Sequence, residues 1–282
     1  MTQTNYISSL NYEELQVPVK AATVYHAHEA SLFLGGNIIP TVNAPTGVLR
    51  VPELAAATAY EVSRGGTNVD DIAASQPAPT ANDIDVNLYA ARSVLRDLGS
   101  IDANEIGRVL GYAVSKKFDE AVMAVIGANT TEQENTETTR DLTVAEIMKA
   151  VGTIRAAGET GQLYCLVNAG VYSELMSDIG SNAFAGGEFQ NTAMRTGFMG
   201  SIAGVQTFTT SYLTDANTGL TSHNVQAAVF SADAYRIAMQ KNIDVELGRR
   251  AEAVGFDCVA SLHAGIGAID SARSVLIIDE SA

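Results

Sequence analysis

The stretch ANEIGRVLGYAVSKKFDEAVMAVIGA, residues 103–128, decides how the rest of the chain must fold. Its apolar residues recur every three or four positions, which is the spacing of one buried helical face. Asp102 stands at the N-cap position, Glu105 three residues later completes a capping-box pattern, and Gly127 and Asn129 end the run. The pattern therefore predicts one helix, about 39 Å long at the usual rise per residue, with a single apolar face. That face consists of Ile106, Val109, Leu110, Ala113, Val114, Phe118, Ala121, Val122, Val125 and Ile126.

The residues before this helix, 46–96, indicate a long hairpin. A first strand is predicted at Gly47–Leu54 and a second at Asp83–Leu95, where apolar and polar residues alternate at the strand period of two. The segment between them is too long for a tight turn. Because a hairpin of this length has few partners within its own chain, we expect it either to be disordered or to lie on a neighbouring subunit.

Residues 1–45 are interpreted as an N-terminal arm. All six prolines of the chain lie within its first 79 residues, and proline resists both helix interiors and central strands. The first third is therefore expected to be extended and irregular, except for one short amphipathic stretch at Thr23–Leu34. The prolines are Pro18, Pro40, Pro45, Pro52, Pro77 and Pro79.

After the long helix, helical and strand patterns alternate, which predicts an α+β fold with helices packed on a mixed sheet. A polar run at 130–140 and a glycine-rich run at Gly180–Gly200 are expected to be loops. Helices are predicted at Leu142–Ala157, with Asp141 as its cap, at Ala169–Ile179 and near Ala232–Gln240. Strands are predicted at Gln162–Val167, Ile202–Thr209, Ala227–Phe230, Ile243–Arg249, Phe256–Leu262 and Ser274–Ile278.

The composition is that of a globular protein with an acidic surface. The 282 residues are 46% hydrophobic and 17% charged, and the formal net charge is −15. The basic residues form no cluster, and clustered cations are what drive binding to a DNA duplex, so specific binding is not expected. An acidic surface repels nucleic acid at short range, which suits a container, although the same charge can serve solubility alone.

The sequence carries no sign of an oxidising compartment or of a membrane. Cys165 and Cys258 lie in apolar strand-like runs without a CxxC pair, which predicts buried free thiols. The N-terminal residues MTQTNYISSLNYEEL have the features of no signal peptide. No apolar run approaches the roughly 18 residues that span a bilayer. We therefore expect the protein to be made and kept in a cytoplasm-like compartment.

Each metal motif fails at a named position. His28-Glu29 begins a zinc HExxH motif, but Leu32 replaces its second histidine. The run DANTG at 215–219 imitates the start of a calcium loop, but Gln226 stands where the bidentate glutamate belongs. No metal site is therefore predicted.

Catalytic and cofactor motifs fail in the same way. Gly265-Ile266-Gly267 is followed by Asp270 where a dinucleotide fingerprint needs its third glycine. The sequence has neither the Gly-Lys pair of a P-loop nor the GxSxG of a nucleophile elbow. The adjacent carboxylates Asp119 and Glu120 are expected to be solvated on a helix surface rather than paired in a pocket. We therefore predict no catalytic residues and no cofactor, as in a protein that is not an enzyme.

The order of these elements resembles that of the tailed-phage major capsid protein, in the Hong Kong phage capsid fold family. Local sequences add to the likeness, because a strand ending in LVN runs into AGVYSELMSDIG, and GSIAGV and AAVFSADAYRIAMQ are similar to later stretches of the family. Where the family often has Asn-Pro, this chain has Asn168-Ala169. The resemblance implies an N-terminal arm at 1–45, an E-loop hairpin at 46–96, a peripheral domain with a spine helix at 97–141, an axial domain at 142–255 and a return to the peripheral domain at 256–282.

The resemblance implies a structural subunit that self-assembles into hexamers and pentamers of an icosahedral phage head around double-stranded DNA. Assembly is then expected in the host cytoplasm, and the mature protein in the virion. Since no long helical segment precedes the arm, scaffolding is expected from a separate protein, alongside a portal and, in some heads, a cement protein. The residues expected to contact neighbouring subunits are Arg50, Glu53, Arg64, Asp83, Asp85 and Arg92, with the loop at 180–200 near the capsomer axes.

The distribution of lysines refines this expectation. Some members of the family crosslink their subunits through a lysine in the E-loop, but no lysine of this chain falls within 46–96. We therefore predict a shell held together without covalent bonds or with the help of a cement protein. The lysines are Lys20, Lys116, Lys117, Lys149 and Lys241.

Two other functions stay open from the sequence alone. An encapsulin-type compartment shares the fold but packages an enzyme, and a soluble α+β enzyme can assemble its site from residues far apart in the chain. The contents of purified particles distinguish the first from a phage head. The size of the protein in native extract distinguishes the second from both shells.

Overall fold

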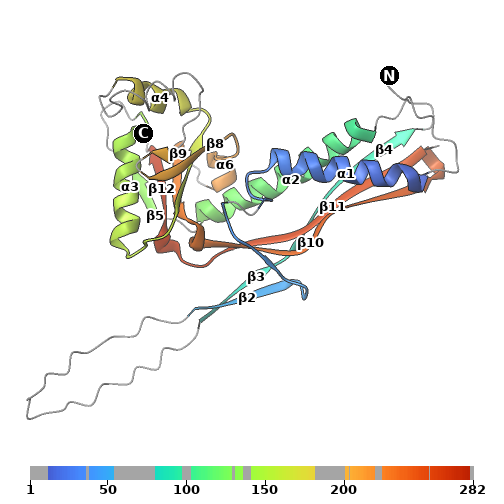
Figure 1. Cartoon of the computed structure of the whole chain (residues 1–282), viewed down its shortest axis with the longest axis horizontal. Helices are drawn as coiled ribbons and strands as arrows, with labels where there is room; N and C mark the ends of the chain where they lie inside the picture. Colours follow the sequence, from blue (N-terminus) through green and yellow to red (C-terminus); the bar gives the residue numbers. More distant parts are fainter. Residues whose placement is uncertain are drawn as a thin grey trace, which may run out of the picture.

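The computed structural model describes residues 12–35, 38–53, 80–96, 103–128, 131–135, 141–181, 201–202, 204–219, 224–253 and 255–279. These residues build a four-stranded sheet, a six-stranded sheet and a two-stranded hairpin. In Figure 1, two long helices lie along the four-stranded sheet, the six-stranded sheet stands at one end of it, and the hairpin leaves the body at an angle. The predicted α+β class with mixed sheets is confirmed.

The predicted central helix is α2 (Ala103–Ala128), with the bounds that the periodicity indicated. Its apolar face packs on the four-stranded sheet, mainly on strand β11. The residues of this face are at most 2% exposed at Leu110, Val114, Phe118, Val122 and Ile126. The periodic pattern therefore identified the helix and the centre of its buried side, but it was wrong for Val109, which is 52% exposed, and for Ala113, which is also exposed. Asp102, the predicted cap, lies outside the described residues.

The expectation of an irregular first third is wrong for much of the arm, because α1 (Tyr12–Ala30) is a helix with Pro18 inside it. A proline in a helix interior costs about 3 kcal/mol relative to alanine. Burial against α2 offsets this cost, since Val19, Thr23 and Ala27 are fully buried while Pro18 faces solvent. Tertiary packing, which composition does not reveal, thus overrides the local preference.

Two glycines of α2 let α1 approach closely. A Cβ added at Gly107 would overlap the Cβ of Ala22, and one added at Gly111 would lie 2.7 Å from the carbonyl oxygen of Thr23. Only glycine fits where one helix backbone lies this near the other. The Gly107–Gly111 pair therefore fixes the crossing of the two helices.

The four-stranded sheet has the order β1-β10-β11-β4. The helix predicted near Ala232–Gln240 is wrong, because only Ala232–Ala234 forms a single helical turn, η2, and strand β10 begins at Tyr235. Pairing with β1 on one side and β11 on the other holds these residues extended. The strands are β1 (Thr41–Asn43), β10 (Tyr235–Arg250), β11 (Gly255–Ala268) and β4 (Asn87–Arg96).

The six-stranded sheet has the order β5-β12-β9-β6-β8-β7. The helix predicted at 142–157 is α3 (Val144–Ala156), and its N-cap is Thr143 rather than Asp141, because the Thr143 hydroxyl accepts from the amide of Glu146. A second predicted helix is α4 (Tyr172–Ser181). The strands are β5 (Thr131–Glu134), β12 (Ser274–Asp279), β9 (Asn224–Ser231), β6 (Leu163–Asn168), β8 (Val205–Thr210) and β7 (Ser201–Ile202).

Three placements differ from the sequence expectations. Strand β5 lies in the polar run 130–140 that was expected to be a loop, and it pairs in parallel with β12. Strand β10 belongs to the four-stranded sheet although its residues were assigned to the axial domain. Strand β12 belongs to the six-stranded sheet although its residues were assigned to the peripheral domain. The domain limits themselves stay a prediction.

The six-stranded sheet is buried on both faces. One face, with Cys165, Val167 and Val229, packs under α3 and α4. The other face, with Leu166 and Phe230, continues into the large core beneath α1 and α2. Both cysteines are buried free thiols, as predicted. Among the described residues, no helix is long and apolar enough to cross a membrane.

Candidate subunit interface

The hairpin consists of β2 (Val48–Glu53) and β3 (Thr80–Asp85). The two strands are antiparallel, with Leu49 opposite Ile84, and within the described residues they form a sheet of their own. The second strand predicted at Asp83–Leu95 is divided at Val86, because the residues after it form β4 and pair with β11. The expectation of a hairpin with few intrachain partners therefore holds for the described residues 48–53 and 80–85 and is wrong for 87–96.

The two faces of the hairpin differ in character. Ile84 is buried in a small cluster with Ala44 and Ala238, and Leu49, Val51 and Val86 pack beside it. This cluster joins the base of the hairpin to the body. The opposite face is exposed and carries charged side chains together with Val48, which is 42% exposed.

Arg50 and Asp83 form a cross-strand ion pair on that exposed face. The Arg50 Nε lies 2.8 Å from Oδ1 of Asp83, and its Nη2 lies 2.8 Å from Oδ2. The Arg50 hydrogen bonds hold the pKa of the Asp83 carboxyl below its usual value. Water screens such an exposed pair, so its contribution to folding is small. Its two-point geometry nevertheless fixes the direction of both charges.

The predicted interface residues do not form one cluster. Asp85 is exposed on the same hairpin face as Arg50 and Asp83, and Glu53 ends β2. Arg92 lies on β4, away from the hairpin, where its Nε donates to Oδ1 of Asp257 on β11 at 2.6 Å. Arg64 and the loop at 182–200 lie outside the described residues. The interface role of all these residues stays a prediction.

Two glycines of β11 determine where the hairpin leaves the body. A Cβ at Gly265 would overlap the carbonyl oxygen of Asp85, and one at Gly267 would lie 2.5 Å from Cγ1 of Ile84. The Gly265-Ile266-Gly267 run does not complete a dinucleotide-binding motif. It is instead the place where residues Ile84 and Asp85 pass close to strand β11. Glycines two apart inside a strand pattern are a sequence signal for such an approach, but they do not identify the segment that crosses.

The base of the hairpin also meets the junction between the two larger sheets. That junction consists of η2 between β9 and β10, and of η4 (Ser271–Arg273) between β11 and β12. The amides of Ile269 and Asp270 donate to the carbonyl of Ala234 at 2.8 and 3.3 Å, which ties the two links together. The side-chain amide of Asn82, on β3, donates to the carbonyl of Ile269 at 3.4 Å. All three sheets therefore meet within a few residues.

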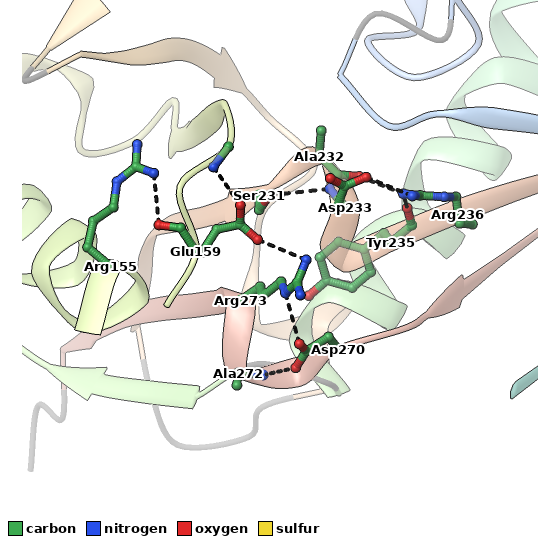
Figure 2. Close-up of polar contacts among 11 residues, drawn as sticks. Arg155, Glu159, Ser231, Ala232, Asp233, Tyr235, Arg236, Asp270, Ala272 and Arg273 are labelled. Atoms are coloured by element: carbon green, nitrogen blue, oxygen red, sulfur yellow. Dashed lines mark hydrogen bonds and ion pairs between the residues drawn. The ribbon is translucent and has the colours of Figure 1, made fainter. Parts of the chain in front are cut away.

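Ion pairs brace this junction, as Figure 2 shows. Arg273 reaches Glu159 through Nη1 at 2.9 Å and Asp270 through Nε at 2.9 Å. The Glu159 side chain is only 7% exposed, and its Oε1 accepts from the amide of Gly161 at 2.6 Å. Arg236 pairs with Asp233 at 2.7 Å across η2. The loop after α3 and both inter-sheet links are thereby held by charge-assisted hydrogen bonds.

The junction also contains a buried hydroxyl pair. The Tyr235 hydroxyl, at the start of β10, donates to the Ser274 hydroxyl at the start of β12 at 2.9 Å. Burial raises the pKa of Tyr235 to about 12, so this group stays a neutral hydrogen-bond donor at physiological pH. It therefore serves packing rather than proton transfer.

The remaining reactive groups are occupied or inaccessible. Burial raises the pKa of Cys165 to about 12 and that of Cys258 to about 11, so neither thiol is an activated nucleophile. The Asp215 carboxylate accepts from the amide of Val225 at 2.8 Å, which is a structural role in place of calcium binding. The described residues contain no group of three or more side chains that could hold a metal ion.

One sequence expectation about carboxylates is wrong. Asp119 is not solvated on the surface of α2 but only 1% exposed, whereas its neighbour Glu120 pairs with Lys117 at 3.0 Å. Asp119 lies one position after Phe118, on the side of α2 that faces the turn after α1. Only a short amphipathic stretch at Thr23–Leu34 was expected there, and not a 19-residue helix packed on α2, so burial of this side of α2 was not predicted.

The sequence model of the family described as phage capsid protein matches residues 97–275, which is more than half of the chain. The chain belongs to the phage capsid protein family. The resemblance seen in the sequence is thereby confirmed, and the protein is a phage capsid subunit. A search of curated proteins finds no match.

Solved structures share the fold at low sequence identity. A structure from Mycobacterium phage Che8 aligns with a TM-score of 0.63 and 16% identity, over 82% of this chain and 84% of that one. The capsid of cyanophage P-SCSP1u aligns with a TM-score of 0.65 and 15% identity, over 88% of each chain. A virus-like particle from Pyrococcus furiosus aligns with a TM-score of 0.62 and 11% identity, over 95% of this chain and 99% of that one. Phage capsids and the Pyrococcus furiosus particle thus share this fold. The family match favours a phage capsid for the present chain.

Proposed function

We propose that copies of this capsid protein form the hexamers and pentamers of an icosahedral phage head that encloses double-stranded DNA. The observation that carries the proposal is the β2–β3 hairpin, which leaves the body and pairs with no other described strand. An isolated two-stranded hairpin is marginally stable in water. A neighbouring copy supplies the missing contact, and such head-to-tail contacts close into rings around rotation axes.

The exposed hairpin face provides the contacts to that neighbour. Arg50 and Asp83 present a fixed pair of opposite charges, and Asp85 adds a further negative charge. Arg92 contributes from the open face of the four-stranded sheet, and the loop at 180–200 lies near the capsomer axis in this arrangement. Glu53, at the end of β2, and Arg64, which lies outside the described residues, are proposed as further contact residues.

The charge of the shell suits enclosed DNA that is not bound by sequence. Each lysine of the chain lies within 4.0 Å of a carboxylate of the same chain, so none of the five is an unpaired cation. DNA binding through counterion release needs clustered cations. In this proposal a portal and a separate scaffolding protein, rather than this chain, direct packaging and assembly in the host cytoplasm.

The size and the contents of native particles test the proposal. Light scattering and negative-stain images of native extract are expected to show closed shells, with DNA inside at high density. A monomer or small oligomer in the same extract would overturn the capsid assembly. Shells that contain a protein cargo and no DNA would overturn the phage-head function but not self-assembly.

The absence of lysine from the hairpin gives a second test. The capsid subunit of disassembled particles is expected to run in SDS as a monomer of 29.6 kDa, because the shell is held by non-covalent contacts or by a cement protein. A ladder of bonded oligomers would contradict this part of the proposal.

A further inference from the structure

The turn that follows α1 is attached to α2 through one buried carboxylate. The Ser31 hydroxyl donates to Oδ1 of Asp119 at 2.5 Å, and the Ser31 oxygen accepts from the amides of Phe33 and Leu34 at 3.2 Å each. Phe33 is fully buried and Leu34 is 5% exposed. Asp119 thus organises a compact turn that leads the chain from α1 toward β1.

This carboxylate has no cation to compensate it among the described residues. The lysines nearest to it along α2, Lys116 and Lys117, both pair with Glu120 instead. The turn after α1 offers the Ser31 hydroxyl and the amide of Leu32. The segment after β8 offers Tyr212, whose pKa is raised by its own burial and then by the charges of Asp119 and Glu120. Within the part of the chain that the structure describes, the groups that face Asp119 are therefore neutral or acidic.

We propose that Asp119 is a proton-dependent clasp, which holds the α1 turn on α2 when protonated and loosens it when ionised. A buried charge without a counter-ion is costly. Two hydrogen bonds from Ser31 and Leu32 compensate it only in part. Ionisation therefore favours any movement that brings water to the carboxylate, and the turn at Ser31–Leu34 is the part of the structure that covers it.

The direction of the pH effect follows from the titration of this group. The pKa of Asp119 is raised from 3.8 to about 7, chiefly by burial, while hydrogen bonds from Ser31 and Leu32 oppose the shift. Between these two pH values the folded state holds a proton that the unfolded state has lost. Stability of the clasp is thus greatest below about pH 4, falls as the pH rises and reaches its minimum above pH 7. A shell of such subunits has an N-terminal helix whose attachment depends on pH near neutrality.

Hydrogen exchange of the full-length subunit tests the clasp. After correction for intrinsic exchange rates, peptides covering 12–35 are expected to lose protection at least several-fold between pH 6 and pH 8.5. Peptides from α3 serve as an internal reference and are expected to change little. In Asp119→Asn the change over 12–35 is expected to disappear, whereas the control Glu252→Gln, at a carboxylate that is 87% exposed, keeps the wild-type profile.

A second variant keeps the test decisive if Asp119→Asn does not fold. Ser31→Ala removes a hydrogen bond that favours the ionised form, so the midpoint of the pH-dependent change is expected to move to higher pH. Protection of 12–35 that is equal at pH 6 and pH 8.5 in the wild type would overturn the proposal. So would a pH dependence that persists in Asp119→Asn, or a midpoint that Ser31→Ala leaves in place.

Discussion

Two regions of the molecule differ in how they are stabilised. One is the contact between helices α1 and α2, and the other is the β2–β3 hairpin. The helices meet through fully buried Val19, Thr23 and Ala27, at a crossing close enough to need glycine on α2. The described strands of the hairpin touch the body only at its base, and their outer face carries an ion pair in water. The body is therefore stable through intrachain packing, whereas in our proposal the hairpin depends on another copy. Variants can therefore separate folding from assembly.

The largest effect on the isolated subunit is expected from Gly111→Val. The new side chain would meet the Thr23 carbonyl at 2.7 Å and the Ala27 amide at 3.0 Å, both of them backbone atoms that cannot move alone. We expect a loss of about 3 kcal/mol or more of unfolding free energy, because overpacking strains both helices. Urea unfolding measures it. The matched control is Gly152→Ala on α3, where a Cβ meets nothing within 4 Å and a small gain in stability is expected.

The same two regions show how far the sequence could predict the fold. The bounds of helix α2 were predicted correctly, because its apolar periodicity and the glycine near its C-terminal end are signals within the helix itself. Helix α1 was missed because proline argued against it, while its stabilising contacts come from residues about 85 positions away. The buried Asp119 was missed with it, since only α1 and its turn cover that side of α2.

Only the part of the candidate interface that depends on local sequence could be predicted. The exposed alternation of Asp83 and Asp85 is visible in the sequence, and both residues lie on the open hairpin face. The division of the second strand at Val86 is not visible, because it depends on pairing with β11, which lies some 170 residues later. The role of Gly265 and Gly267 likewise depends on a crossing between distant segments.

A smaller loss of stability is expected from Arg273→Gln at the junction of the sheets. The change leaves the Glu159 carboxylate, which is 7% exposed, without its cationic partner. An unpaired buried acceptor costs about 1–3 kcal/mol, and the Gly161 amide still compensates part of this cost. We therefore expect a loss of about 1–2 kcal/mol in urea unfolding. Arg250→Gln is the matched control, because its nearer partner Glu252 is 87% exposed and its other partner, Asp257 at 4.0 Å, keeps its pair with Arg92. An equal loss there would show that Arg273 does not brace the junction.

An effect confined to acid is expected from Asp244→Asn. Lys20 of α1 and Lys241 of β10 both pair with Asp244, at 2.6 and 2.7 Å, and their hydrogen bonds hold its pKa well below the usual 3.8. The contribution is present above about pH 4 and is lost as the pH falls toward the folded pKa. The Tm of the wild type should therefore fall more steeply between pH 5 and pH 2 than that of Asp244→Asn. Asp85→Asn should follow the wild type, and parallel curves for all three would contradict the prediction.

The smallest effect on the isolated subunit, and the largest on the shell, is expected from charge changes in the hairpin. Arg50→Glu replaces the pair with Asp83 by a repulsion on an exposed face, so the Tm should hardly change while the yield of closed particles falls. A drop in Tm comparable to that of Gly111→Val would show that the hairpin belongs to the body. Sedimentation and negative-stain images measure the yield.

The double variant Arg50→Asp with Asp83→Arg sharpens this test. It restores the cross-strand pair but reverses the charges that a neighbour meets. If the neighbouring subunit contacts these side chains, particle yield stays low in the double variant, because complementary charges are now misplaced. Full recovery would mean that the pair only stiffens the hairpin and that the contact lies elsewhere along it. The two outcomes thus separate a hairpin that is recognised by its charges from one that is recognised by its shape.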